Sequence, residues 1–290
     1  MSLEPFLPIH ALLLILLAAS AHATWNFLAK RSADKPHLIW FSSAIEVLLL
    51  APIATWILAG QHPGPRTIPF LIATGILHVM YTECLLRGYR AGDFTVVYPL
   101  ARGSAPLLSF FGAIFFLHEH TSAVAVLGAM LITVGILLSF GGFSTLRKAS
   151  SHASLFWGAA TGTIIASYTV VDGYSVTRLL IAPLLVEYAG NLFRAIVLSG
   201  QAWRDRAALR SEFGQCWTEA LGIAVLTPVG YVLALSAMRI APVSRVAPVR
   251  EMSMMIGMYL GARFLRERHM MRRMTGAALV ACGVAALALG

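Results

Sequence analysis

The sequence predicts an all-α integral membrane protein in which ten transmembrane helices form two inverted five-helix repeats. Three observations lead to this fold class. Hydrophobic residues make up 58% of the chain and charged residues only 12%, whereas a soluble domain averages about 25% charged residues. Ten apolar windows have the length of a membrane-spanning helix, about 20 residues. Finally, the two halves of the chain carry the same sequence pattern.

The internal repeat is clearest in the second part of each half. Residues 116–120 (Phe-Leu-His-Glu-His) are followed by Gly128 and Gly135, and residues 264–268 (Phe-Leu-Arg-Glu-Arg) are followed by Gly276 and Gly283. Upstream, the Tyr98-Pro99 segment ending at Arg102 is echoed by a Pro248 segment ending at Arg250. Such a duplication in a hydrophobic chain is typical of transporters built from structural repeats.

The expected spans are read in windows of about 20 apolar residues. They are residues 8–29, 37–59, 67–87, 93–117, 121–141, 153–174, 180–200, 216–238, 242–263 and 272–289. The first repeat is expected at 1–141, a linker at 142–152 and the second repeat at 153–290. Because five is odd, the second repeat must enter the membrane from the opposite side. Prolines are expected to interrupt the fourth and ninth spans, and the charged stretch 203–212 is expected to separate the seventh span from the eighth.

The charges predict an orientation. Of the 22 Lys and Arg residues, 15 fall in the loops after spans one, three, five, seven and nine, and only three fall in the alternate loops. The positive-inside rule then places both termini outside the cytoplasm, with a bacterial inner membrane as the expected location. The net charge of +9 is attributed to contact with anionic lipid rather than with nucleic acid. Ala21-His22-Ala23 resembles a signal cleavage site, but the uncharged start favours a retained first helix.

Ionisable side chains inside the spans are candidates for function, because each costs at least about 2.5 kcal/mol on insertion scales. Tyr98 and Arg102 share a face of the fourth span, and Arg250 with Glu251 occupies the matching place in the ninth. An arginine fork suits carboxylate, phosphonate or phosphate groups. The alternative, weighed equally, is an internal ion pair of these arginines with Glu251 or Glu83 that holds the halves together.

The third span offers aromatic and titratable groups. His78 and Tyr81 share one face, and Tyr231 is the counterpart of Tyr81 in the second repeat. His78 can titrate near neutral pH and is therefore a candidate for proton coupling, together with Glu83 and Asp172. A histidine inside a membrane also serves as a hydrogen bonder between helices. Glu83 is positioned to pair with a residue four positions later, Arg87.

The first and sixth spans contribute further candidates. In the first, His22 shares a face with Trp25 and Asn26, although Trp25 is also placed to sit in an interfacial aromatic belt. In the sixth, Tyr168 and Asp172 are four residues apart, and Asp172 is the best acidic candidate for a substrate amine or a proton. The alternative for Asp172 is a carboxylate at a helix end, in contact with headgroups.

Two acidic residues lie at similar depth in the second and seventh spans. Glu46 lies deep in an apolar run and must be protonated or paired. Glu187, Asn191 and Arg194 form an i, i+4, i+7 stripe that is most simply a structural network. The glycines at 128, 135, 276 and 283 recur at seven-residue spacing, which favours close contact of the fifth and tenth spans or a dimer interface.

Several classes of chemistry are not indicated. The three cysteines are unclustered, and residues 118–120 point apart on any helix, so no metal or other cofactor is expected. The chain has neither a nucleotide-binding loop nor a nucleophile–base arrangement, and an enzyme is not the expected function. The expected partners are a small-molecule substrate, membrane lipids and candidate coupling protons. Two complete repeats make a monomer sufficient, with a dimer as the alternative.

The sequence resembles the EamA-like permeases of the drug/metabolite transporter superfamily. The resemblance rests on residues 23–30 (Ala-Thr-Trp-Asn-Phe-Leu-Ala-Lys), on residues 86–119 with their mid-span proline, and on 243–248 with Glu267 in the second half. It implies transport of amino acids, other metabolites or organic cations by alternating access, often coupled to protons. Amino-acid exporters of this superfamily often have cytoplasmic termini, whereas the charges here argue the reverse.

The expected function is therefore secondary active transport of a small zwitterion or anion, such as an amino acid or an aminophosphonate. Arg102 or Arg250 would hold the acid, Asp172 or Glu83 would meet the amine, and the aromatic residues would form walls. One alternative is an exporter of aromatic or cationic drugs, or a transporter of choline-like quaternary amines. A second alternative is a lipid flippase or a membrane enzyme acting on lipid-linked substrates.

Overall fold

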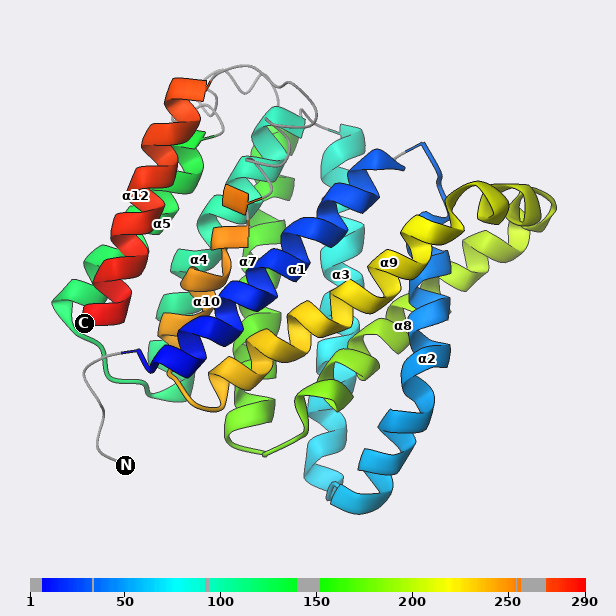
Figure 1. Ribbon diagram of the computed structural model, residues 1–290, viewed down its shortest axis with the longest axis horizontal. Helices are drawn as coiled ribbons and strands as arrows, with labels where there is room; N and C mark the ends of the chain where they lie inside the picture. The colour runs from blue at the N-terminus through cyan, green and yellow to red at the C-terminus, as the bar shows by residue number, and fades with distance from the viewer. Residues whose placement is uncertain (1–6, 33, 92–93, 140–151, 254, 257–269) are drawn as a thin grey trace.

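A computed structural model describes residues 7–32, 34–91, 94–139, 152–253, 255–256 and 270–290, and in these ranges the protein is helical throughout its regular structure. The fold class predicted from composition, an all-α membrane protein, is confirmed. The α-helices are α1 (Ile9–Arg31), α2 (Leu38–Gln61), α3 (Ile68–Ala91), α4 (Phe94–Leu117), α5 (Ala123–Ser139), α7 (His152–Thr177), α8 (Pro183–Arg204), α9 (Arg206–Met238), α10 (Val243–Arg250) and α12 (Met270–Leu289) (Figure 1). A short 3₁₀ turn, Pro65–Thr67, lies between α2 and α3.

The helices have the surface of a membrane protein. Six of them, α1, α2, α3, α4, α7 and α9, are long and apolar enough to cross a bilayer, and α5 and α12 contain shorter apolar helices. Large apolar side chains lie on the outside, for example Trp56 at 77% exposure and Phe115 at 69%. Exposed apolar surface on this scale would be unfavourable in water and is expected where lipid covers the protein.

The observed helix starts differ from the expected span starts by more than three residues at one place. The charged stretch 203–212 was expected to separate the seventh span from the eighth, and α8 does end within it, at Arg204. α9, however, begins at Arg206, ten residues before the expected eighth span. Ala, Leu, Arg and Glu dominate this stretch, and all are good helix formers. The charges therefore mark the end of α8 but do not prevent the residues after Asp205 from being helical. A further kink falls at Cys216, whose φ of −132° and ψ of 15° are non-helical.

The prolines act differently in the two repeats. The fourth span was expected to be interrupted, but α4 remains helical through Pro99 and Pro106. In the second repeat Pro242 precedes the first turn of α10, and this helix ends at Arg250, two residues after Pro248. A proline cannot donate to the carbonyl four residues earlier. Pro106 therefore leaves the Arg102 carbonyl without its helical partner. The rest of the expected ninth span, from residue 257, lies outside the described residues.

Helix directions follow from the contacts between halves. α1 and α9 are antiparallel, because Arg31 lies near Glu219 while Ala18 lies against Gly230. The equivalent pair, α3 and α7, is antiparallel too, with Phe70 stacked on Tyr174 and Arg87 over Trp157.

α4 and α7 are parallel instead. Gly158 lies against Leu100 at one end of this pair, and Arg178 donates to the Leu117 carbonyl at the other. These are the directions that ten alternating spans in two inverted repeats predict.

α5 and α12 meet through their glycines. A Cβ on Gly128 would lie 2.8 Å from the carbonyl oxygen of Gly283, and a Cβ on Gly135 would lie 2.7 Å from that of Gly276. Only glycine allows the two backbones to approach this closely. The expected contact of the fifth and tenth spans is therefore present within the chain.

The principal apolar core joins both halves. Its fully buried members include Phe110 of α4, Ile132 and Ile136 of α5, and Leu235 and Met238 of α9. The start of α1 and the end of α12 lie at one end of the molecule, while the end of α1 and the α8–α9 elbow lie at the other (Figure 1).

Candidate functional site

Two buried arginines share one carboxylate at the contact of α4 with α10. Arg102 Nη1 of α4 lies 3.6 Å from Glu251 Oε2, and Arg250 Nη2 of α10 lies 3.8 Å from Glu251 Oε1. Arg102 and Arg250 are each 8% exposed, and Glu251 is 2% exposed. Arg250 Nη2 also donates to Thr169 Oγ1 of α7 at 3.4 Å. The structure therefore brings together three predicted residues, from both halves of the chain, in a cluster with more positive than negative charge.

α1 contributes a histidine to this cluster. Arg102 Nη2 lies 2.8 Å from Nε2 of His22, and the indole Nε1 of Trp25 lies 3.2 Å from Nδ1 of the same ring. A neutral imidazole accepts at only one of its nitrogens. The ring therefore accepts a hydrogen bond either from the guanidinium or from the indole. The amide of Asn26 is used within α1, where Nδ2 donates to the His22 carbonyl oxygen at 2.7 Å.

An acidic and aromatic group adjoins the arginines. The Tyr231 hydroxyl of α9 donates to Asp172 Oδ2 of α7 at 2.5 Å, and the guanidinium carbon of Arg250 lies 5.9 Å from the centre of the Tyr231 ring. His78 of α3 stacks on Tyr168 at 4.4 Å between ring centres and meets Tyr231 edge-on at 5.6 Å. Asp172 is fully buried. It therefore sits inside the helix bundle, not at a helix end facing headgroups.

Tyr81 and Tyr98 border this group. Tyr81 lies 6.0 Å from Tyr168, ring centre to ring centre, and packs with it around Ala105. Tyr98 is half-buried on α4, one turn before Arg102, and packs against the principal core. Tyr81 and Tyr98 thus lie next to residues of the cluster.

Several buried polar atoms in the cluster lack hydrogen-bond partners among the described residues. They include Arg102 Nε, Arg250 Nη1 and Asp172 Oδ1. A buried polar atom without a partner costs about 1–3 kcal/mol, and more when it belongs to a charged group. The two arginine nitrogens and the aspartate oxygen therefore have hydrogen-bonding capacity that the described residues do not use.

One predicted residue lies apart. Glu83 is exposed, with a side-chain exposure of 52%, and its Oε1 pairs with Arg87 Nε at 2.7 Å on the same helix. The i, i+4 pairing predicted for these two residues is present. Glu83 thus takes no part in the buried cluster, because its turn of α3 faces outward.

The sequence pattern did not single out three residues that the structure adds. His22 was noted only for its face, Thr169 not at all, and Thr74 lies one turn before His78, with its carbonyl 2.9 Å from His78 Nδ1. His22 could have been found as a polar residue on the Trp25 face of an apolar helix. Thr169 follows Tyr168 directly, and no spacing rule would have selected it.

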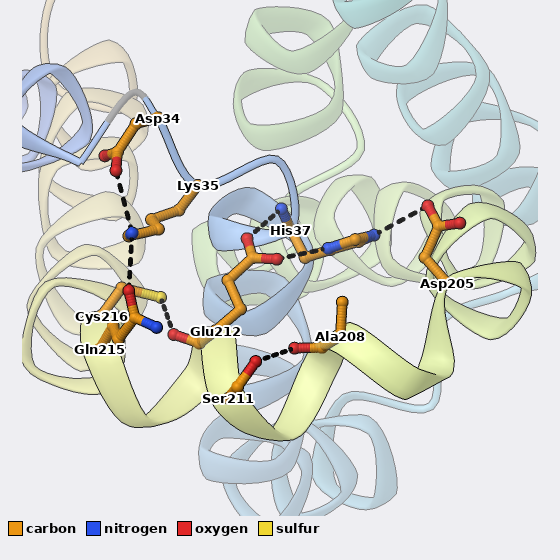
Figure 2. A network of polar contacts seen from close by, with 9 residues as sticks. All are labelled: Asp34, Lys35, His37, Asp205, Ala208, Ser211, Glu212, Gln215 and Cys216. Carbon is orange, nitrogen blue, oxygen red and sulfur yellow. Dashed lines mark hydrogen bonds and ion pairs between the residues drawn. The ribbon is translucent and has the colours of Figure 1, made fainter.

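A second polar cluster lies at the loop between α1 and α2 (Figure 2). The His37 ring is held between two carboxylates, with Nδ1 2.8 Å from Glu212 Oε2 and Nε2 3.3 Å from Asp205 Oδ2. Its backbone N–H also donates to Glu212 Oε1 at 2.8 Å. Beside it, Lys35 Nζ contacts Asp34 and Gln215. This cluster fastens the loop to the α8–α9 elbow and is distant in sequence from the arginine cluster.

Duplicated helices with charged side chains buried where the halves meet are the architecture of a secondary transporter. The model of the EamA-like transporter family matches residues 9–141 and again residues 152–289. The chain therefore belongs to the EamA-like transporter family and is a membrane transporter of small molecules, of the drug/metabolite transporter type.

The fold also matches a solved structure. A crystal structure described only as "Crystal structure of protein" superposes with a TM-score of 0.71 at 15% identity, covering 96% of this chain and 97% of that one. At this identity the likeness concerns the fold alone. No curated protein sequence matches the chain.

Proposed function

We propose that this transporter moves small zwitterionic or anionic metabolites, of the amino acid or aminophosphonate kind, by alternating access. The observation that carries the proposal is the pair of buried arginines, Arg102 and Arg250, that share the single carboxylate of Glu251. Two positive charges facing one negative charge leave an excess that an incoming anionic group would neutralise. Arg102 Nε and Arg250 Nη1 are the donors still available to it.

The other end of the site supports an amine. Asp172 Oδ1 has no partner among the described residues, and Asp172 is linked through the Tyr231 hydroxyl to the ring that Arg250 covers. A ligand with an acidic and a basic group could therefore contact both ends. Trp25, Tyr81, Tyr98 and Tyr168 would border the ligand. His78 stacks on Tyr168, and Asn26 directly follows Trp25 on α1.

The site would lie between two repeats, 1–141 and 153–290, joined by the linker 142–152. α1, α3 and α4 contribute from the first repeat, and α7, α9 and α10 from the second. Rocking of one repeat against the other would expose such a site to each side in turn. From the loop charges we propose non-cytoplasmic termini and a bacterial inner membrane, with one chain sufficient for transport.

A second candidate function is transport of aromatic or quaternary cations. The observation that favours it is the buried Asp172 with the rings of Tyr168, Tyr231 and His78 close by. Aromatic faces and one carboxylate are the groups that bind quaternary ammonium ions. The nearby guanidinium of Arg250 opposes this, because it already occupies one face of Tyr231.

A thermal-shift screen of the purified protein separates the two candidates. The panel is L-phenylalanine, aminomethylphosphonate and choline, tested on wild type, Arg102→Ala and Asp172→Asn. Ligand at about 100 times its Kd stabilises by about 2.7 kcal/mol. Stabilisation by either of the first two compounds, lost in Arg102→Ala, supports the anion site. Stabilisation by choline alone, lost in Asp172→Asn, overturns it in favour of cation transport.

A matched control is Arg87→Ala, which removes an arginine from an exposed ion pair with Glu83. It should retain every ligand response of the wild type. Proton coupling, with His78, Asp172 and Glu83 as the sequence-based candidates, is tested by uptake of the stabilising compound into proteoliposomes. Uptake that does not respond to a pH gradient of either sign would overturn coupling.

A further inference from the structure

The contact between α2 and α8 contains a second set of buried charges, away from the arginine cluster. Glu46 of α2 is 1% exposed and Glu187 of α8 is 5% exposed. The two side chains face each other across this contact. Asn191, one turn after Glu187, donates to the Ser43 carbonyl of α2, Arg194 lies 4.0 Å from Glu46 Oε2, and the two carboxyl groups interact as neighbours. Two carboxylates cannot hydrogen-bond to each other without a proton, because each is only an acceptor when ionised.

The nearby cation does not balance both acids. Arg194 Nη2 lies 4.0 Å from Glu46 Oε2, which is too long for a hydrogen bond. Its shorter contacts are elsewhere, because Nη2 donates to Asn191 Oδ1 at 2.5 Å and Nε donates to Ser43 Oγ at 3.1 Å. One positive charge therefore faces two acids. An uncompensated buried charge costs several kcal/mol.

One carboxyl oxygen of the pair accepts no hydrogen bond from the part of the chain that the structure describes. Glu46 Oε1 is buried and has no hydrogen-bond partner among the described residues. The amide of the neighbouring Asn191 donates instead to the Ser43 carbonyl oxygen, with Nδ2 at 3.1 Å. A proton on either carboxyl group would let that group donate a hydrogen bond to the other. The other group would stay ionised and balance the charge of Arg194.

The neighbouring helices supply few further charges. α3 contributes His78, which lies against Gly190 of α8, and α7 contributes Asp172, which acts electrostatically with Glu187. α9 packs against both α2 and α8, but its Lys, Arg, Asp and Glu residues all lie between 206 and 219, toward its first half. Glu46, Glu187 and Arg194 are therefore the groups that decide the charge of this contact.

We propose that Glu46 and Glu187 form a proton-binding site that holds one shared proton at the α2–α8 contact. The site differs from the three coupling candidates named from the sequence, and it gives Glu187 a role beyond the structural network first expected of it. Loss of the proton would leave two like charges facing each other across the two repeats and would weaken their contact. The use of this site in coupled transport rests on the proposed function, whereas the presence of the shared proton does not.

Infrared spectroscopy of the protein in lipid nanodiscs tests the site with the proton itself as the ligand. The wild type at neutral pH should show the C=O stretching band of a buried protonated carboxylic acid, and this band should shift in D₂O. Glu46→Gln and Glu187→Gln should each remove the whole of this band, because the remaining carboxylate pairs with Arg194 and needs no proton. Glu83→Gln, in an exposed ion pair, and Glu212→Gln, whose carboxylate is held by His37, serve as controls and should leave the band in place.

Two results would overturn the proposal. One is the absence of a band that Glu46→Gln or Glu187→Gln removes; the other is a band that each variant reduces only in part, which would mean two independently protonated acids. Arg194→Gln provides a further variant should either glutamine variant fold poorly. It removes the cation that favours ionisation and should keep the band, so a loss of the band in Arg194→Gln also contradicts a shared proton.

Discussion

Two contacts between the repeats, α5 with α12 and α4 with α10, differ in how far they keep the internal symmetry of the chain. In the first, Gly128 meets the carbonyl of Gly283, and its repeat counterpart Gly276 meets the carbonyl of Gly135. Exchanging the two halves returns the same pair of contacts. In the second, Arg102 and Arg250 are counterparts, but Glu251 between them has Gly103 as its counterpart.

This difference separates what holds the repeats together from what the site can bind. The glycine contact depends on backbone shape, which duplication copies. The arginine was also copied, but its counter-charge exists in one half only, as do Asp172 and His22. Two arginines that share one acid are therefore an asymmetric arrangement, because a symmetric pair would have either two acids or none. Under the proposed function, divergence of a few side chains on a common backbone would create the site for a charged ligand.

The largest expected effect breaks the asymmetric contact. Glu251→Gln removes the carboxylate that both arginines contact and leaves two buried like charges. Removing one partner of a buried ion pair typically costs about 3–5 kcal/mol. We expect the largest loss of thermal stability of any variant considered, measured by unfolding of the purified protein. The double variant Glu251→Gln/Arg250→Gln should recover part of the loss, because one of the opposed charges is gone.

A mild phenotype of Glu251→Gln would contradict this account of the cluster. The control is Glu83→Gln, which removes a carboxylate from an exposed i, i+4 pair. Pairs of that kind contribute only about 0.3–0.5 kcal/mol. The comparison therefore separates the loss of a buried counter-charge from the general effect of neutralising a glutamate.

The second expected effect tests the symmetric contact. A methyl group on Gly128 or on Gly276 would meet a backbone carbonyl oxygen at 2.8 or 2.5 Å, so the helices must move apart. Overpacking of this kind costs about 1–3 kcal/mol. Gly128→Ala and Gly276→Ala should lower thermal stability by similar amounts, because they are equivalent positions. Gly200→Ala, whose Cβ would meet no atom within 4 Å, is the control and should not destabilise.

Unequal losses in the two glycine variants, with one near zero, would show that the contact is not symmetric in energy. Testing one variant on each helix also distinguishes a local defect from a defect of the contact. A defect confined to α5 would lower the stability of Gly128→Ala alone, whereas a defect of the α5–α12 contact would lower the stability of both variants.

The sequence was sufficient to predict much of the fold, because apolar length is a direct consequence of the bilayer. The helices α1 to α5 begin within a residue or two of the expected spans. The start of α9 was missed because charge limits what can be buried in lipid but does not stop a helix. α4 remains one helix because packing against neighbouring helices can compensate for the loss of the backbone hydrogen bond that Pro106 cannot make.

The site was predictable only where its residues lie within the spans by simple spacing. Arg102, Arg250 and Glu251 were found because arginine and glutamate are rare in apolar windows. Glu83 was selected by the same rule, but its rotation on α3 places it outside the cluster. The contact of His22 with Arg102 joins residues 80 positions apart, and only the packing of α1 against the other repeat creates it. The shared carboxyl site at Glu46 and Glu187 likewise depends on packing between two repeats.

The smallest expected effect lies at Gly103, the counterpart of Glu251, and it sharpens the comparison most directly. A Cβ there would lie 2.7 Å from Leu137 Cδ2 and 3.0 Å from its Cγ, so it meets a side chain of α5 and no backbone atom. The flexible end of a leucine can rotate away, and we expect Gly103→Ala to cost less than about 1 kcal/mol. Thermal unfolding beside Gly276→Ala measures the difference. Equal losses would mean that Gly103 is held as tightly as the glycines of α5 and α12; a smaller loss would mean that this position was free to diverge, as it did at Glu251 in the other repeat.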